Sequence, residues 1–254
     1  MSVDVDRDRG LVRIVLNSPE RRNALTCEEF ERLGAELTRI ARTPSDRAVL
    51  LTGAGSAFCA GAQLAEAVPE EPTLAIMGRI NEAARALHRL PQPIVAAVNG
   101  PAYGAGMSIA LGCDIVLAAD SATFCQVFVK RGLVPDFGSS WLLPRIVGRQ
   151  AAKRLVLTGE PVGAAEALAL GIAAQVVPAG DLPGTAESLA RSLADGPPIA
   201  QRLAKRLLDA SSTNGFDDQL DAEAAGAAVA SASEDVAEAF AAFAARRPPV
   251  FRGR

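Results

Sequence analysis

Two short turns made of glycine and alanine constrain the fold of this chain more than any other feature of its sequence. They are residues 60–62 (Ala-Gly-Ala) and 104–106 (Gly-Ala-Gly). Buried strands are predicted ahead of them, at 47–52 and 94–98, because both stretches are short and nearly continuous in apolar residues. A repeated order of strand, loop and helix with such strands predicts a parallel β-sheet covered by helices.

The N-terminal stretch adds a hairpin and a helix to this pattern. Residues 3–8 and 11–17 predict two strands joined by a tight turn at Gly10. Thr26, with Glu29 three residues later, forms the sequence signature of a capping box and predicts the start of a helix.

The remaining signals divide the chain into a mixed body and a helical end. A helix is predicted at 74–90 and a further strand at 114–118. From about residue 142 onward the pattern is almost wholly helical. We therefore predict an α/β body in residues 1–195 and a helical C-terminal region in residues 196–254.

The composition limits the possible partners. The chain has 254 residues, a formal net charge of −3 and no basic block, which argues against nucleic acid. No apolar run reaches the roughly 20 residues needed to cross a bilayer, and the N-terminus lacks signal-peptide features. The cysteines show no metal-binding spacing, so we expect four reduced, small buried side chains. We expect a soluble cytoplasmic protein without a metal site or a membrane partner.

The two turns have a chemical interpretation and a purely structural one. Small residues let the backbone approach a ligand closely, and N–H groups at the start of a helix favour developing negative charge. Two such turns facing each other supply the two donors of an oxyanion hole. Either turn alone is also typical of a tight strand-to-helix connection. Neither matches a dinucleotide-binding fingerprint or a P-loop.

The order and context of these turns resemble the crotonase superfamily, the enoyl-CoA hydratases and isomerases. The resemblance covers nearly the whole chain. Its motifs are Leu-Asn-Ser-Pro at 16–19, Arg-Asn-Ala-Leu at 22–25, Phe-Cys-Ala-Gly-Ala-Gln-Leu at 58–64, Ala-Val-Asn-Gly-Pro-Ala at 97–102, Gly-Cys-Asp at 112–114, Leu-Thr-Gly-Glu at 157–160, residues 165–171, and Pro-Val-Phe-Arg-Gly at 249–253.

This resemblance implies a ββα-spiral core, a helical C-terminal trimerisation region, and a homotrimer or dimer of trimers. It implies an acyl-CoA thioester as the substrate, with coenzyme A as part of that substrate and no separate cofactor. The thioester oxygen would lie between the N–H groups of Ala62 and Ala105. Arg21 or Arg22 would lie near the CoA phosphates. The CoA site would further include Ala24, Ala60, Gln63, which stands where aspartate is usual, and Leu64.

The residues that define a hydratase of this family are absent. Such an enzyme holds water between two glutamates, and the matching positions here are Ser108 and Phe128. Neither side chain takes a proton from water at neutral pH. The two-carboxylate mechanism is therefore missing.

Asp136 offers a different acid–base group. The stretch from 124 to 141 resembles isomerases that act on ring-opened or epoxidised phenylacetyl-CoA, in which an aspartate here shuttles a proton. One carboxylate can move a double bond from the β,γ to the α,β position. On local sequence alone, Asp136 is equally typical of a helix N-cap. We expect Phe128, Phe137 and Trp141 to form an apolar wall that raises its pKa.

Other residues near the turns are assigned to binding or to the surface. Tyr103, Gly104 and Met107 are expected to shape the acyl pocket, and His88 to be a surface residue at a helix end. The dehalogenase branch of the family also carries an aspartate, but it needs a histidine base elsewhere. Three readings stay open: an isomerase of phenylacetate or fatty-acid metabolism, a β-oxidation hydratase, and a non-catalytic acyl-CoA-binding protein.

Overall fold

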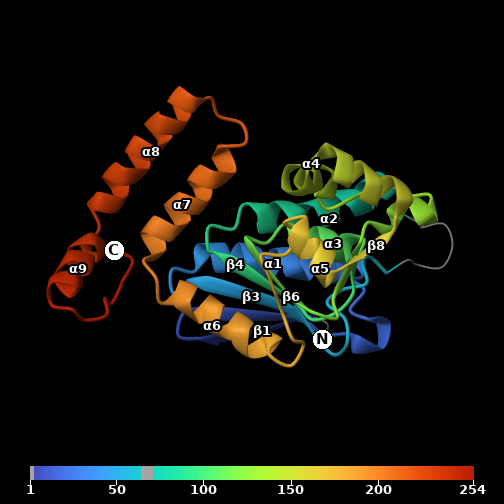
Figure 1. The fold of residues 1–254 in the computed structure, drawn as a ribbon, viewed down its shortest axis with the longest axis horizontal. Helices are drawn as coiled ribbons and strands as arrows, with labels where there is room; N and C mark the ends of the chain where they lie inside the picture. The colour runs from blue at the N-terminus through green and yellow to red at the C-terminus, as the bar shows by residue number, and fades with distance from the viewer. Residues whose placement is uncertain (1–2, 64–70) are drawn as a thin grey trace.

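The computed structural model describes residues 3–63 and 71–254, so Leu64 lies outside the described residues. Its main element is a six-stranded sheet in which β1 and β2 pair antiparallel and every other neighbouring pair is parallel (Figure 1). The strand order is β1 (Val3–Asp8), β2 (Leu11–Leu16), β3 (Ala48–Gly53), β4 (Ile94–Val98), β6 (Ile115–Ala119) and β9 (Gln175–Val177). The predicted parallel sheet and N-terminal hairpin are confirmed.

Helices cover this sheet. In Figure 1, α6 (Leu182–Ala194) lies below the sheet, and α2 (Thr73–His88), α3 (Ala105–Leu111) and α4 (Ser139–Thr158) lie above it. Helix α1 (Cys27–Arg42) packs against α2 and begins at the predicted capping box: Glu29 N donates to Thr26 Oγ1, and Thr26 N donates to the Glu29 carboxylate at 2.7 Å. Its buried face repeats at helical spacing, as the sequence predicts.

The prediction that the chain is almost wholly helical from about residue 142 onward is wrong at two short strands, Pro161–Gly163 and Gln175–Val177. Strand β9 joins the edge of the main sheet beside β6. A second, three-stranded sheet contains β5 (Ala102–Tyr103), β7 (Thr123–Cys125) and β8 (Pro161–Gly163). These strands have two or three residues, too few to show an alternating apolar pattern. Short helices also occur along the chain: η1 (Pro19–Arg21) near the N-terminus, and η2 (Val127–Arg131) and α5 (Ala164–Ala169) farther on.

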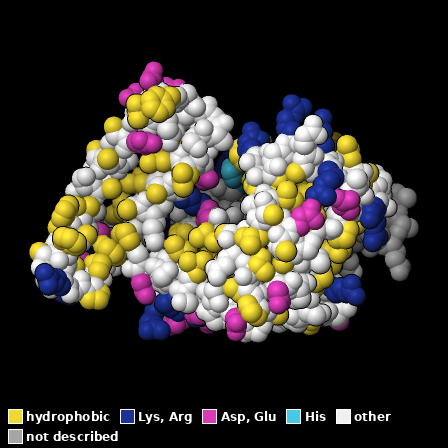
Figure 2. Space-filling view, in the orientation of Figure 1, with side chains coloured by type: hydrophobic (Ala, Val, Ile, Leu, Met, Phe, Trp, Pro, Cys, Tyr) yellow, Lys and Arg dark blue, Asp and Glu magenta, His cyan; other side chains and the backbone are white. Residues whose placement is uncertain are grey.

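The C-terminal helices α7 (Pro198–Ala210), α8 (Phe216–Ser231) and α9 (Glu234–Ala244) project to one side of the body (Figure 1). Figure 2 shows hydrophobic side chains gathered over them. Phe240 and Phe243 are 72% and 85% exposed. The chain end folds back on α9, where the buried carboxylate of Asp235 accepts hydrogen bonds from Arg252 N at 2.6 Å and Gly253 N at 2.9 Å.

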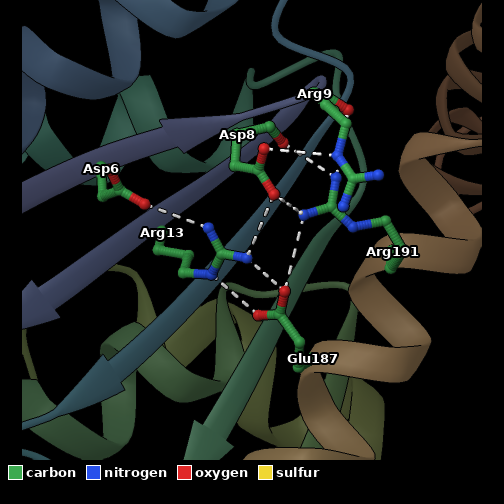
Figure 3. Close-up of polar contacts among 6 residues, drawn as sticks. All are labelled: Asp6, Asp8, Arg9, Arg13, Glu187 and Arg191. Atoms are coloured by element: carbon green, nitrogen blue, oxygen red, sulfur yellow. Dashed lines mark hydrogen bonds and ion pairs between the residues drawn. The ribbon is translucent and has the colours of Figure 1, made fainter.

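Six charged side chains tie α6 to the β1–β2 hairpin (Figure 3). Arg13 lies among them, with Nη1 3.0 Å from Asp6 Oδ2 and Nε 2.8 Å from Glu187 Oε2. Arg191 Nη2 lies 2.8 Å from Asp8 Oδ2. Partly exposed pairs of this kind contribute at most about 1 kcal/mol each. The network therefore fastens a covering helix to the sheet.

The cysteines are all free, and Cys59, Cys113 and Cys125 are buried as expected, whereas Cys27 is only half-buried. Burial raises the pKa of the Cys59 thiol to about 12, so this thiol stays protonated. In the part of the chain that the structure describes, no helix is long and apolar enough to span a membrane.

Candidate active site

The two small-residue turns touch each other. Strands β3 and β4 are parallel neighbours, so their carboxyl ends lie side by side and the loops after them meet. A Cβ on Gly106 would lie 2.1 Å from the carbonyl oxygen of Cys59. A Cβ on Gly61, whose φ is +107°, would lie 2.9 Å from Tyr103 O and 3.5 Å from Ala105 N. Both glycines are therefore required for the close approach of the two turns.

Two main-chain donors are left available where the turns meet. Leu25 N donates to Gly61 O and Gln63 N donates to Leu25 O, each at 2.8 Å. Among the described residues, the N–H of Ala62, between them, has no hydrogen-bond acceptor. The same holds for Ala105 N, the first residue of α3, as is usual in a first helical turn. Both are candidate donors to a ligand oxygen.

The segment predicted to bind CoA lies beside the first turn. Ala60 N donates to Arg22 O at 2.9 Å, so the stretch containing Ala24 runs along the stretch from Ala60 to Gln63. Arg21 is occupied: it donates to Gln63 Oε1 at 2.7 Å and also bonds the Glu29 carboxylate. Arg22 is exposed and forms no ion pair with a described residue. It is therefore the better candidate to meet a phosphate.

Asn23 is a site residue to which the sequence argument assigns no role. It is fully buried, and its Nδ2 donates to Ala54 O at 2.9 Å and Ala57 O at 2.8 Å. Its Oδ1 accepts from Ser18 N at 2.8 Å. Its φ of +57° lies in the left-handed region, which asparagine tolerates better than most residues. Asn23 thus holds the segment around residues 22–25, which is predicted to bind CoA, against the loop that leads to the first turn.

Asp136 lies in a left-handed turn directly before α4. Phe137 and Gly138 have φ of +51° and +80°. The Phe137 side chain is 3% exposed and packs at 5.7 Å from the ring of Phe30, which anchors this unusual conformation. Ser139 N and Oγ each donate to Asp136 O at 3.0 Å. The N-cap of α4 is Gly138, with no side-chain cap bond, so the interpretation of Asp136 as the helix N-cap is wrong.

The Asp136 side chain is half-buried and has no counter-charge nearby. Its Oδ1 is inaccessible and meets no hydrogen-bond partner among the described residues. Desolvation raises its pKa to about 6, with no nearby charge contributing. Such a group exchanges a proton close to neutral pH, as a general base or acid must.

Comparison with known proteins shows which family this chain belongs to. The sequence profile of the enoyl-CoA hydratase/isomerase family matches residues 6–254. The 1,2-epoxyphenylacetyl-CoA isomerase of Escherichia coli (strain K12) is 41% identical over 253 residues, 97% of each chain. The chain belongs to the enoyl-CoA hydratase/isomerase family. The resemblance to the crotonase superfamily is thereby confirmed, and the protein is an enzyme that acts on acyl-CoA.

Two further relatives are hydratases by name. The short-chain-enoyl-CoA hydratase of Clostridium acetobutylicum is 32% identical over 252 residues, covering 97% of this chain and 95% of the relative. The crystal structure of enoyl-CoA hydratase from Bacillus anthracis superposes with a TM-score of 0.96 at 33% identity, covering 100% of both chains. The predicted crotonase-like α/β fold is confirmed.

The two positions that the resemblance matches to the glutamates of a hydratase carry side chains unsuited to holding water. Ser108 is fully buried on α3, and its hydroxyl donates to Gly104 O at 3.1 Å, within its own helical turn. The Phe128 ring lies 3.7 Å from where a Cβ on Gly104 would be. Phe128 therefore forms an apolar wall at the second turn. Tyr103 is half-buried, and its hydroxyl accepts from Thr123 Oγ1 at 3.4 Å.

Phe137 and Trp141 line a cavity of about 490 Å³ between α2 and α4. Trp141 is 39% exposed, with the Arg145 guanidinium 4.0 Å above its ring and the edge of His88 at 5.4 Å. His88 is exposed at the end of α2, as predicted. The structure thus brings Phe137 and Trp141 together, whereas Asp136, Ala62 and Ala105 do not line this cavity.

No metal site accompanies these groups in the ranges that the structure describes. Within 3–63 and 71–254, no cluster of three or more His, Cys, Asp or Glu side chains is arranged to hold a metal ion.

Proposed function

We propose that this enzyme isomerises enoyl-CoA thioesters, moving a double bond from the β,γ to the α,β position, with Asp136 as the acid–base group. The observation that carries the proposal is the half-buried Asp136 carboxyl, whose pKa is raised to about 6 by desolvation, while no second carboxylate stands at Ser108 or Phe128. A hydratase needs two groups to hold and split water, and an isomerase needs one to move a proton.

The proton is taken from Cα and returned at Cγ. Asp136 removes the Cα proton, and the electron pair moves into the thioester carbonyl to give a dienolate. The N–H groups of Ala62 and Ala105 donate to the dienolate oxygen. Asp136 then delivers the same proton to Cγ, and the carbonyl re-forms with the double bond at α,β. Each oxyanion donor contributes about 3 kcal/mol of transition-state stabilisation.

We assign the CoA moiety to the segment beside the first turn, where Ala24, Ala60 and Gln63 offer backbone groups and Arg22 offers a cation that forms no ion pair with a described residue. Leu64 belongs to the same proposed site and lies outside the described residues. The reaction needs no cofactor besides the CoA of the substrate.

For the acyl group we propose a phenylacetyl-derived thioester over a simple fatty acyl chain. The name of the Escherichia coli relative supports this, and so does the Phe128 ring beside the second turn. We further propose that residues 196–254 form the trimer contact. Phe240 and Phe243, exposed on α9, supply apolar area suited to a second copy of the chain.

The proposal is tested with 3-enoyl-CoA and 2-enoyl-CoA, following the absorbance of the conjugated thioester. We expect rapid conversion of the 3-enoyl substrate and hydration of the 2-enoyl substrate at less than about 1% of that rate, given the 10²–10⁴-fold contribution of a general base. Hydration as fast as isomerisation would establish a hydratase. CoA binding without either reaction would establish a non-catalytic protein.

A further inference from the structure

The cavity between α2 and α4 has no role in the proposed mechanism. It measures about 490 Å³, and none of the three groups assigned to the reaction lines it. Apolar side chains form most of its wall, namely Ala84, Leu87, Phe137, Trp141 and Leu142. A cavity of this size and character, set apart from the reacting groups, is a candidate for a binding site of its own.

The cavity is large enough for an aromatic ligand. Pockets that bind small molecules usually measure about 300–1,000 Å³, and an apolar cavity of about 150 Å³ already holds a benzene molecule. Phe137 and Trp141 present aromatic surface, against which a further ring packs edge-on or with an offset. The lining therefore favours a flat apolar ring and leaves room for a short substituent on it.

Two polar side chains at this wall are available to that substituent. Asn81 lines the cavity, and its carboxamide forms no hydrogen bond with a described residue. The Arg145 guanidinium lies 4.0 Å from the centre of the Trp141 ring and donates to Trp141 O at 3.0 Å, but it pairs with no carboxylate of a described residue. Arg85 also lines the cavity and is paired with Glu82. Arg145 thus offers a positive charge that suits a carboxylate on the ligand.

We propose that the cavity between α2 and α4 is a second binding site, separate from the thioester site, for a small aromatic carboxylate. The ring lies against Phe137 and Trp141, and the carboxylate pairs with Arg145. Because Phe137 directly follows Asp136, a ligand in contact with Phe137 stabilises the turn that carries the acid–base group. This link to catalysis rests on the proposed function, whereas the binding site itself does not.

Trp141 reports binding directly, because it is the only tryptophan in the chain. Phenylacetate and its uncharged analogue phenylacetamide are titrated into the protein, and the midpoint of the change in fluorescence gives the Kd of each compound. We expect phenylacetate to bind about tenfold more tightly, because a hydrogen bond to a charged partner is stronger than one between neutral groups. The absence of a saturable change with either compound overturns the proposal.

Arg145→Met removes the positive charge and keeps an unbranched apolar side chain. We expect the two compounds to bind this variant equally, because the preference for the anion comes from Arg145. Arg149→Met is the control, since Arg149 is exposed on the same helix and does not line the cavity, and it should keep the preference. Midpoints are compared instead of amplitudes, because the Arg145 guanidinium lies over the reporting ring. A preference that survives Arg145→Met overturns the pairing.

Ala84→Leu places the ligand by filling the cavity. We expect this variant to lose binding, and with it the rise in Tm that phenylacetate causes in the wild type by binding the folded state. Ala75→Leu, at an exposed position of the same helix, is the matched control and should bind as the wild type does. Equal binding by both variants overturns the location. If Ala84→Leu fails to fold, the comparison of Arg145→Met with Arg149→Met still decides.

Competition with acyl-CoA tests whether the site is separate. Butyryl-CoA occupies the thioester site without a ring, and phenylacetyl-CoA brings a ring with it. Displacement of phenylacetate by neither thioester sustains the separate site. Displacement by phenylacetyl-CoA alone assigns the cavity to the acyl group of the substrate, and displacement by both places phenylacetate at the thioester. Either result overturns the separate site. No turnover is needed, so a protein without isomerase activity refutes the proposed function and leaves this test intact.

Discussion

In the two glycine–alanine turns the candidate reacting groups are main-chain N–H donors, and in the turn before α4 the reacting group is a side chain. The first pair is fixed by contact between backbones, with a Gly106 Cβ position only 2.1 Å from Cys59 O. Asp136 is fixed indirectly, by the buried Phe137 ring and the bonds from Ser139.

The backbone donors and the Asp136 side chain differ in how they tolerate sequence change. A backbone donor stays in place under any substitution that keeps the turn, so it suits a function shared by hydratases and isomerases alike. A carboxylate is lost in one substitution, so it suits the step in which related enzymes differ. Binding of the thioester and choice of reaction are therefore carried by separate parts of the site.

The largest effect is expected from Asp136→Asn. It keeps the shape of the side chain and removes the base, so we expect kcat for 3-enoyl-CoA to fall about 10³-fold. Acyl-CoA affinity, measured by calorimetry, should stay within about twofold, since the turns are untouched. Asp181→Asn, at an exposed position before α6, is the control and should retain full activity. Retained turnover in Asp136→Asn would remove the base from the mechanism.

Gly106→Ala tests the backbone half of the site. The added methyl must displace the Cys59 carbonyl, so the two turns separate and at least one donor is misplaced. We expect kcat to fall about 10²-fold, close to the loss of one oxyanion donor. Gly78→Ala on α2 is the control, because its Cβ meets nothing within 4 Å. It should leave kcat unchanged and stabilise the helix by about 1 kcal/mol. Equal kcat values for both variants would mean that the contact between the turns is unimportant.

The sequence predicts the backbone half of the site better than the side-chain half. Small residues after apolar strands specify turns whatever surrounds them, so the two turns follow from local pattern and strand order, whereas Ala62 and Ala105 are assigned as donors by the resemblance to the crotonase superfamily. The environment of Asp136 depends on a left-handed Phe137 and on packing against Phe30, 107 positions earlier, and no local pattern encodes that contact.

The same distinction, between local signals and contacts with distant residues, explains which parts of the fold the sequence predicts. The capping box at Thr26 and the helical spacing of α1 are local signals, and α1 is found where it is predicted. Strand β9 is three residues long and exists because β6 offers it an edge. The sequence does not reveal the role of Asn23 for a similar reason, because its side chain donates to carbonyl groups more than 30 positions away.

Asn23→Ala is expected to have a smaller effect, on binding more than on the reaction. Losing its buried bonds should lower the free energy of unfolding by about 2 kcal/mol and raise KM for acyl-CoA about tenfold, with kcat nearly unchanged. Asn17→Ala, which removes an exposed bond to Asp4, is the control and should change neither quantity. A fall in kcat with KM constant would mean that Asn23 supports the chemical step instead of substrate binding.

The smallest expected effect is on stability, and its sign is set by the raised pKa of Asp136. The carboxyl titrates at about 6 when folded and near 3.8 when unfolded, so the folded state binds the proton more tightly. The penalty for burying the carboxylate is therefore fully present above pH 6 and vanishes below pH 3.8. At about 1.4 kcal/mol for each pKa unit, reduced for partial exposure, it amounts to about 2 kcal/mol. Asp136→Asn should be more stable than the wild type by that amount at pH 7.5 in urea unfolding, and equally stable near pH 3. A difference independent of pH would mean that the carboxylate is solvated or paired, and Asp136 would lose its distinction from an ordinary surface aspartate.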